Sequence, residues 1–383
     1  MQRRSFLLGT GSLFMAQLLA GCAQNNQGTF NVELLKDSIP GQVVNQFQKG
    51  LQEKVQLKFA PVGQLLDLFQ RLQTWQQKPK TSDAKGWGSF IPFMSSEKSA
   101  VADLVTLGDY WIKAAIEQKL IQPIDVAQLS GWKALPKRWQ ELVTRNDLGE
   151  VDAQGKVWAA PYRWGVTAIV YRRDRFQELG WTPKDWGDLW KSELRDRISL
   201  LDQPREVIGL VLKKLGKSYN TENLAAVKEL KAELQKLKPQ VKFYGSNRYL
   251  EPLLNGDTWL AVGWSSDIIP AIGRYPELAA ITPQSGTAVW ADSWVHPTSK
   301  NKEDLLYKWI DFCWQPDIAK EISVLTKTNS PIPANISSSE IQDSLRNLLL
   351  NNQAVFDKSE FLLPLSASAM KQYDSLFAEI KNG

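Results

Sequence analysis

The chain has few of the residues from which catalytic and metal centres are usually built. Its 383 residues include one histidine, so a metal site with several histidine ligands is excluded. That residue, His296, precedes Pro297 without a recognisable Ser-His-Asp frame. No CxxC pair occurs, and no glycine-rich phosphate loop follows a predicted strand. The sequence therefore predicts no metal, no cofactor and no enzyme, with an enzyme of unassigned acids as a weaker alternative.

Long apolar runs are also scarce, and the one that occurs lies at the N-terminus. It follows Arg3 and Arg4 and continues without charge to Ala20. A transmembrane helix needs about 20 apolar residues, so this run is too short to span a bilayer comfortably. Residues 19–22 (LAGC) resemble the cleavage box of bacterial lipoproteins, in which the cysteine thiol takes a diacylglycerol. The paired arginines resemble a twin-arginine export signal, and general secretion stays open as the route.

These features predict where the mature protein works. Residues 1–21 are expected to be a signal peptide, and 22–29 a polar tether that begins at the lipidated Cys22. No second long apolar run follows, so the mature body is expected to be soluble and held to a membrane by its lipid. The predicted location is the periplasm or the outer face of the cytoplasmic membrane. Lipidation of Cys22 leaves Cys313 as a lone thiol, expected to be buried.

Charge and length limit the partners and the architecture. The net charge of +5 does not indicate nucleic acid, because an exported chain rarely meets it. The basic residues are scattered or lie on helices such as 224–238, which predicts a solvated face. The length suits one large or two medium domains.

Along the mature body, short β-rich runs alternate with amphipathic helices, which is typical of an α/β fold. The predicted strands are 55–60, 102–107, 166–172, 198–201, 241–244, 258–263 and 288–295. The predicted helices are 40–52, 63–77, 109–119, 184–191, 205–215, 222–237, 303–326, 340–351 and 368–381. Residues 78–100, rich in Lys, Ser and Gly, interrupt this pattern and predict an excursion loop.

Tryptophan is abundant, with 16 residues, and several stand beside carboxylates. In the predicted strand 288–295, Trp290, Asp292 and Trp294 alternate and therefore share one face. Two indoles beside a carboxylate can receive a cation, because each ring face attracts it by about 0.5–2 kcal/mol and the carboxylate pairs with its charge. A tryptophan on a strand is also a common core residue, so both interpretations stay open at this point.

Similar groups follow two further predicted strands. Trp264 and Asp267 come after one, and Tyr110 and Trp111 come after another. Strand ends that open into loops are where α/β proteins bind ligands. The sequence therefore predicts ligand contacts at these strand ends.

Five stretches form an ordered pattern over nearly the whole mature body. They are ADLVTLGDYWIKAAIEQKLIQPID (102–125), WAAPYRWGVTAIVYRRD (158–174), LDQPREVIGLVLKKLG (201–216), LNGDTWLAVGWSSDI (254–268) and WADSWVHPTSKNKEDLLYKWIDF (290–312). In this order they resemble the periplasmic spermidine/putrescine-binding proteins of bacterial ABC importers. The resemblance implies an α/β, two-lobed periplasmic-binding-protein fold of type II, with crossover strands and a ligand cleft between the lobes. Lobe closure would present the loaded, monomeric protein to a membrane permease.

The resemblance also implies how the chain divides into lobes. The crossovers would fall at residues 164–172 and 289–295. Lobe 1 would then comprise 30–163 plus 290–335. Lobe 2 would comprise 164–289 plus 336–383.

Carried over from the same family, the ligand-binding positions correspond to Tyr110, Glu206, Trp264, Trp290 and Asp292. Tyr110 and Trp264 would be flat faces for a methylene chain, and Trp290 a cation–π face. Asp292 would pair with an interior ammonium and Glu206 with a terminal one. Glu206 equally suits the first turn of its predicted helix, where an acid favours the helix dipole.

Several positions depart from the family pattern. Gln203 stands where the family usually carries an acid, and Ser330 stands in place of a tyrosine. An expected aromatic is replaced around Leu35 and Ser38, although Asp37 would keep an acid there. Loss of one carboxylate from a buried charge-recognition set costs several kcal/mol if the ligand still brings a full ammonium. A shorter diamine, a mono-cation and a neutral solute all stay open.

The sequence thus predicts an exported, lipid-anchored solute-binding component of an ABC importer. The expected solute is a polyamine or another small organic cation. A binding protein for a neutral solute such as a sugar is the alternative, and the charge of the ligand discriminates the two.

Overall fold

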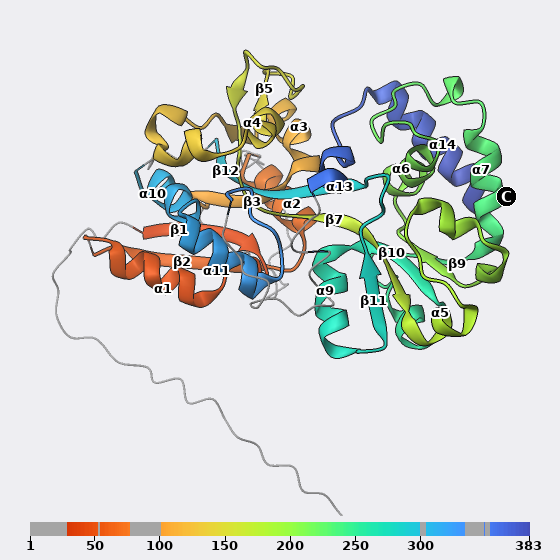
Figure 1. The fold of residues 1–383 in the computed structure, drawn as a ribbon. Helices are drawn as coiled ribbons and strands as arrows, with labels where there is room; N and C mark the ends of the chain where they lie inside the picture. The colour runs from red at the N-terminus through yellow and green to blue at the C-terminus, as the bar shows by residue number, and fades with distance from the viewer. Residues whose placement is uncertain (1–28, 53, 77–100, 299–303, 334–347, 349–352) are drawn as a thin grey trace, which may run out of the picture.

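The computed structural model describes residues 29–52, 54–76, 101–298, 304–333, 348 and 353–383 (Figure 1). Four predictions fall wholly or almost wholly outside these residues. They are the signal peptide 1–21, the lipidated Cys22 with its tether 22–29, the loop 78–100 and the helix 340–351.

Strands and helices alternate along the described residues. The strands are β1 (Thr29–Leu35), β2 (Gln56–Val62), β3 (Leu104–Gly108), β4 (Ile121–Gln122), β5 (Thr144–Arg145), β6 (Lys156–Val157), β7 (Ala160–Arg172), β8 (Ile198–Leu200), β9 (Val241–Tyr244), β10 (Leu260–Trp264), β11 (Leu278–Ile281), β12 (Ala288–Pro297) and β13 (Glu360–Phe361). The α-helices are α1 (Gly41–Gly50), α2 (Leu65–Gln76), α3 (Asp109–Glu117), α4 (Lys137–Val143), α5 (Arg173–Leu179), α6 (Pro204–Lys214), α7 (Leu230–Leu237), α8 (Glu251–Leu254), α9 (Ser265–Arg274), α10 (Asp304–Cys313), α11 (Pro316–Thr326), α13 (Gln353–Lys358) and α14 (Ala367–Asn382).

The first lobe is built on the parallel strands β2, β1 and β3, with β12 antiparallel to β3 beside them. All five residues of β3 are buried, as expected of a parallel strand covered on both faces. The helices α1, α2, α3, α10 and α11 lie around this sheet (Figure 1). Phe47 of α1 packs edge-on against Trp309 of α10, with ring centroids 5.0 Å apart. The Trp309 ring also lies 4.8 Å from that of Phe59 of β2, so aromatic side chains connect these helices to the sheet.

The second lobe is built on β7, β10, β8 and β9, with β11 also paired to β7. The helices α6, α7 and α14 share an apolar core with these strands, to which they contribute Ile208, Leu234 and Tyr373 respectively. The C-terminal helix α14 packs against α6 and α7 (Figure 1). The helix α9 packs against β7, β10 and β11.

Two strands run from one lobe to the other. β7 is 13 residues long, and it pairs with β12 through residues 160–166 and with β10 through residues 167–171. β12 pairs with β3 of the first lobe along its other edge. Continuous β-structure therefore joins the two lobes.

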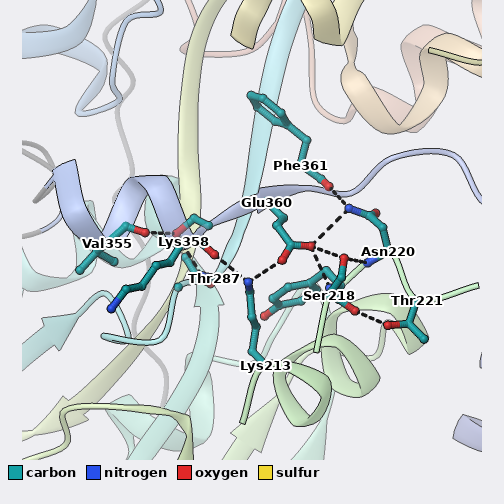
Figure 2. Close-up of polar contacts among 12 residues, drawn as sticks. Lys213, Ser218, Asn220, Thr221, Thr287, Val355, Lys358, Glu360 and Phe361 are labelled. Carbon is teal, nitrogen blue, oxygen red and sulfur yellow. Dashed lines mark hydrogen bonds and ion pairs between the residues drawn. The ribbon is translucent and has the colours of Figure 1, made fainter. Parts of the chain in front are cut away.

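A third segment, residues 353–363, contacts both lobes. Arg138 of α4 donates a hydrogen bond to the carbonyl oxygen of Phe356, and its guanidinium lies 4.3 Å from the centroid of that ring. On the side of the second lobe, Glu360 accepts a hydrogen bond from Lys213 of α6 at 2.5 Å (Figure 2). The segment thus ties α4 to α6 across the crossover strands.

Most predicted strands are present. Those expected at 55–60, 102–107, 198–201, 241–244, 258–263 and 288–295 correspond to β2, β3, β8, β9, β10 and β12. The strand expected from residue 166 begins instead at Ala160. Pro161 and Gly165 weaken the strand signal in that part of the sequence. Pro161 is accommodated because the pairing with β12 is irregular between Asp292 and Ser293.

The helix predictions needed more correction. The single helix expected at 303–326 is two helices, because Pro316 cannot continue α10 and instead begins α11. The expected helices 184–191 and 222–237 are reduced to a 3-10 helix at Trp186–Trp190 and to α7 with a 3-10 turn at Leu224–Ala226. The elements that were not predicted include β1, β11, α4, α5, α8, α9 and α13. Pro270 lies inside α9, and because proline disfavours a helix interior, the sequence did not predict this helix.

Candidate functional site

The crossover strands place an acid and a base opposite each other. In their antiparallel pairing, Asp292 of β12 lies opposite Arg163 of β7. The Nη2 and Nε atoms of Arg163 lie 2.6 and 2.7 Å from Oδ2 of Asp292, and both side chains are buried. Burial raises the pKa of the Asp292 carboxyl, and the Arg163 guanidinium opposes that shift. Asp292 therefore already has a cationic partner within the chain.

The indole of Trp290 lies against the backbone of Gly165. A Cβ atom at Gly165 would lie 2.2 Å from this ring and 2.4 Å from Oγ of Ser265, so glycine is required for the contact. Oγ of Ser265 accepts a hydrogen bond from the backbone N–H of Val166 at 3.1 Å. The guanidinium carbon of Arg163 lies 5.9 Å from the Trp290 ring centroid. Trp290 thus joins the Arg163–Asp292 pair to the start of α9.

Glu206 lies in the first turn of α6 with its carboxylate buried. Its oxygens accept hydrogen bonds from the Thr167 hydroxyl at 3.0 and 3.1 Å and from Nε1 of Trp264 at 3.1 Å. Burial raises the pKa of Glu206, while these hydrogen bonds and the nearby Arg205 oppose the shift. Arg205 itself donates to the carbonyl oxygen of Leu363. Within the part of the chain that the structure describes, the hydrogen-bond donors to Glu206 are therefore neutral groups.

Trp264 and Asp267 are connected through a tyrosine that the sequence did not single out. The Tyr249 hydroxyl donates to Oδ2 of Asp267 at 2.9 Å and accepts from the backbone N–H of Trp264 at 3.1 Å. A Cβ atom at Gly263 would lie 1.8 Å from the Tyr249 ring. Glycine at that position thus lets the tyrosine reach both partners, which orders the end of β10 and the start of α9.

The two aromatic residues after β3 have different environments. Tyr110 is 50% exposed, whereas Trp111 stacks on Phe69 of α2 with ring centroids 4.7 Å apart. Asp109, directly before them, is buried and accepts a hydrogen bond from the backbone N–H of Ala291 at 3.2 Å. Burial raises the pKa of Asp109 to about 7, although that hydrogen bond opposes the shift. Tyr110 is thus the surface aromatic of the pair, and Trp111 mainly fills the contact with α2.

Asp37 follows β1, whose carboxyl end lies at the same sheet edge as that of the parallel strand β3. Its side chain is exposed, and its φ of 60° lies in the left-handed region that aspartate tolerates better than most residues. The neighbouring Ser38 is buried. Asp37 therefore belongs to the same edge as Tyr110 without being part of the buried network.

Sequence reasoning did not select Arg163, Thr167, Tyr249 or Asp109 as site residues. Their roles depend on strand register and on side-chain contacts between distant elements, which residue types alone do not reveal. A signal for Arg163 is nevertheless present, because a charged residue interrupts the otherwise uncharged run of β7 before Arg172. An unpaired charge is rarely buried, so such a residue indicates a partner on a neighbouring strand.

The described residues also bear on metal binding, membrane insertion and the free thiol. Among them, no group of three or more His, Cys, Asp or Glu side chains is arranged to hold a metal ion. None of the helices in the described ranges combines the length and apolarity that a membrane crossing requires. Cys313 is buried, which confirms that prediction, and burial raises the pKa of its thiol.

Comparison with known proteins shows the family of this chain. Residues 99–356 match the family model of the bacterial extracellular solute-binding proteins. The chain belongs to this family. Its members are solute-binding proteins of transport systems and do not form an enzyme family.

Named relatives of this solute-binding protein bind polyamines. It is 31% identical over 231 residues to the spermidine/putrescine-binding periplasmic protein of Salmonella typhimurium, an alignment that covers 60% of this chain and 63% of that protein. It is 28% identical to the putrescine-binding periplasmic protein PotF of Escherichia coli, over 58% of this chain and 62% of that protein. The chain thus spans less than two thirds of the length of these curated relatives.

A solved structure confirms the predicted fold. The spermidine/putrescine ABC transporter substrate-binding protein PotD of Streptococcus pneumoniae matches with a TM-score of 0.76 at 20% identity. The match covers 93% of this chain and 99% of that one. The solute-binding protein therefore has the two-lobed, type II periplasmic-binding-protein fold.

Proposed function

We propose that this solute-binding protein takes a polyamine or a related small organic cation between its lobes and delivers it to an ABC permease. The observation that carries the proposal is the buried Glu206, whose carboxylate accepts hydrogen bonds from Thr167 and Trp264. A carboxylate accepts more hydrogen bonds than these two groups supply. An ammonium that completes its coordination would also neutralise its charge, and charge-assisted hydrogen bonds are about twice as strong as neutral ones.

Aromatic surfaces around the carboxylates fit the rest of such a ligand. Trp264 donates to Glu206, Trp290 lies beside the Arg163–Asp292 pair, and both rings are only partly buried. Flat aromatic faces suit methylene chains, and they attract a cation by about 0.5–2 kcal/mol each. The spermidine and putrescine bound by the named relatives are ligands of this type, which further supports the proposal.

A ligand panel tests this function. We expect saturating putrescine, spermidine or a choline-like cation to raise the unfolding temperature, because a ligand at 100 times its dissociation constant stabilises the folded state by about 2.7 kcal/mol. Oligosaccharides at equal concentration serve as the neutral comparison and are expected to leave the unfolding temperature unchanged. Stabilisation by an oligosaccharide alone would favour a receptor for a neutral solute and contradict the proposal.

We also propose that the protein is exported and held to the outer face of a membrane by lipid on Cys22. The support is the sequence LAGC at 19–22, directly after the apolar run. A single acyl chain binds a membrane only marginally, whereas two acyl chains, as in a diacylglycerol, give stable anchoring. Cys22→Ala should leave an unlipidated precursor. Intact-mass analysis of the wild-type membrane fraction checks this, and a mature N-terminus without a diacyl adduct at Cys22 would overturn it.

A further inference from the structure

We propose that Arg163 restricts the ligand to a small organic cation with one charged end, a narrower class than the polyamines and related cations proposed above. This inference rests on the proposed function, because it concerns the same site. Its basis is the difference between two buried carboxylates. Asp292 is paired with Arg163, whereas the described donors to Glu206 are the neutral Thr167 and Trp264.

The sheet itself holds the Arg163–Asp292 pair together. The two residues lie opposite each other in adjacent antiparallel strands, so their backbone positions are fixed by hydrogen bonds. Two guanidinium nitrogens contact Oδ2 of Asp292, and the side chains are only 7% and 3% exposed. Arginine stays protonated in proteins. The chain thereby supplies, at Asp292, the positive charge that a second ammonium of the ligand would otherwise bring.

An ammonium placed at Asp292 would meet an unfavourable environment. It would lose its hydration and lie beside the guanidinium of Arg163. The carboxylate that it would contact, Asp292, is already neutralised by that guanidinium. Like charges brought together at a desolvated site cost several kcal/mol. A diamine with the length to reach both carboxylates would therefore gain binding free energy at Glu206 and lose it at Asp292. A ligand with one ammonium would gain at Glu206 without that loss.

Side-chain contacts connect the residues at the two ends of the proposed site. Trp264 donates to Glu206, and the next residue, Ser265, meets Trp290 over Gly165. Trp290 lies in turn beside Arg163. Nε1 of Trp290 is buried with no hydrogen-bond partner among the described residues. An uncharged acceptor at the second end of the ligand would satisfy this donor, which an ammonium has no lone pair to do.

A matched pair of ligands tests the inference. Putrescine carries an ammonium at both ends, and N-acetylputrescine has one of them capped as a neutral amide. We expect titration calorimetry to show that the wild-type protein binds N-acetylputrescine at least about tenfold more tightly than putrescine. Arg163→Met frees the carboxylate of Asp292 and should shift this ratio towards putrescine by at least about tenfold.

A second variant guards against misfolding, because Arg163→Met leaves an unpaired buried carboxylate. The double variant Arg163→Met/Asp292→Asn removes both charges and should keep the preference for N-acetylputrescine. If the wild type bound putrescine more tightly than Arg163→Met does, the inference would be overturned. The proposed function would stand, since the protein would still be a cation receptor. Failure of every ammonium compound to bind the wild type would remove the proposed function, and the inference with it.

Discussion

Glu206 and Asp292 are both buried carboxylates, and burial raises the pKa of both, yet their neighbours differ in charge. Asp292 contacts the Arg163 guanidinium at 2.6 Å, which satisfies its charge within the protein. Glu206 accepts hydrogen bonds from a hydroxyl and an indole N–H. Of these two acids, Glu206 is therefore the one whose ionised form gains most from a cationic ligand, because ionising a buried carboxyl without a partner is costly.

The buried carboxyl of Asp109 should make the free energy of unfolding depend on pH. Its pKa rises from 3.8 to about 7 on folding, so folded protein keeps a proton that the unfolded chain releases. Its contribution to stability is present below pH 3.8 and is lost as the pH rises through about 7. Asp109→Asn keeps an acceptor for Ala291 and should raise the free energy of unfolding by about 1–3 kcal/mol more at pH 8 than at pH 5.

Urea denaturation at the two pH values measures this effect. The exposed Asp374 of α14 offers a matched control, because Asp374→Asn should change stability equally at both. A gain for Asp109→Asn that does not depend on pH would show that the Asp109 carboxyl is not the group responsible.

At the scale of secondary structure elements, the packing of the Trp290 ring of β12 against β7 depends on one glycine. A side chain at Gly165 would overlap the Trp290 ring and Ser265 Oγ. Gly165→Ala should therefore destabilise the protein by about 1–3 kcal/mol, as overpacked cores usually do, and should weaken ligand binding by displacing Trp290. Chemical denaturation and calorimetry measure the two effects.

Gly187→Ala is the control for this substitution. Apart from its chain neighbours, no atom of the described residues lies within 4 Å of a Cβ placed at Gly187, so this change should alter stability by no more than about 0.5 kcal/mol. If Gly165→Ala bound ligand with unchanged affinity despite the predicted loss of stability, Trp290 would be a core residue without a role in recognition.

The segment 353–363 supports a second prediction at this scale. Glu360 accepts hydrogen bonds from Lys213, the Ser218 hydroxyl and the backbone N–H of Tyr219 (Figure 2). Hydrogen bonds to charged groups contribute about 1.5–3 kcal/mol, so Glu360→Gln should lower the free energy of unfolding by about that amount. Hydrogen exchange should show faster opening of the segment.

An exposed ion pair in the same lobe provides the comparison. Lys231 and Glu379 are 53% and 54% exposed, so Glu379→Gln should change stability by less than about 1 kcal/mol. Equal effects of the two substitutions would mean that the contacts of Glu360 do not hold the segment to α6.

The elements also show what the sequence could and could not reveal. Strands rich in β-branched and apolar residues, such as β3 and β10, were predicted closely because burial on both faces selects such residues. The first half of β7 and the whole of α9 were not predicted, because they contain proline and glycine. In these elements tertiary packing outweighs local preference. The aromatic and acidic residues proposed for the site were selected from the sequence by type and position. The pairing of Asp292 with Arg163 was not, because it depends on a register between strands far apart in the sequence.

At the scale of the whole molecule, the crossover strands and the segment 353–363 join the lobes, and the predicted ligand contacts come from both sides of this junction. Asp292 and Tyr110 belong to strands and helices of the first lobe, whereas Glu206 and Trp264 belong to the second. A ligand that contacts both sides favours the closed arrangement, since it shifts the equilibrium by its difference in affinity for the two states. Residues 164–172 and 289–295 are the proposed hinge.

Binding of a cation by the wild-type protein and by Glu206→Gln tests the central claim most directly. The substitution keeps a hydrogen-bond acceptor for Trp264 and removes the charge, and truncating one member of a desolvated charge pair costs about 2–5 kcal/mol. Titration calorimetry with the ammonium compound that binds the wild type best should therefore show an affinity at least roughly thirtyfold lower in Glu206→Gln. Unchanged affinity of the variant for that compound would contradict the account.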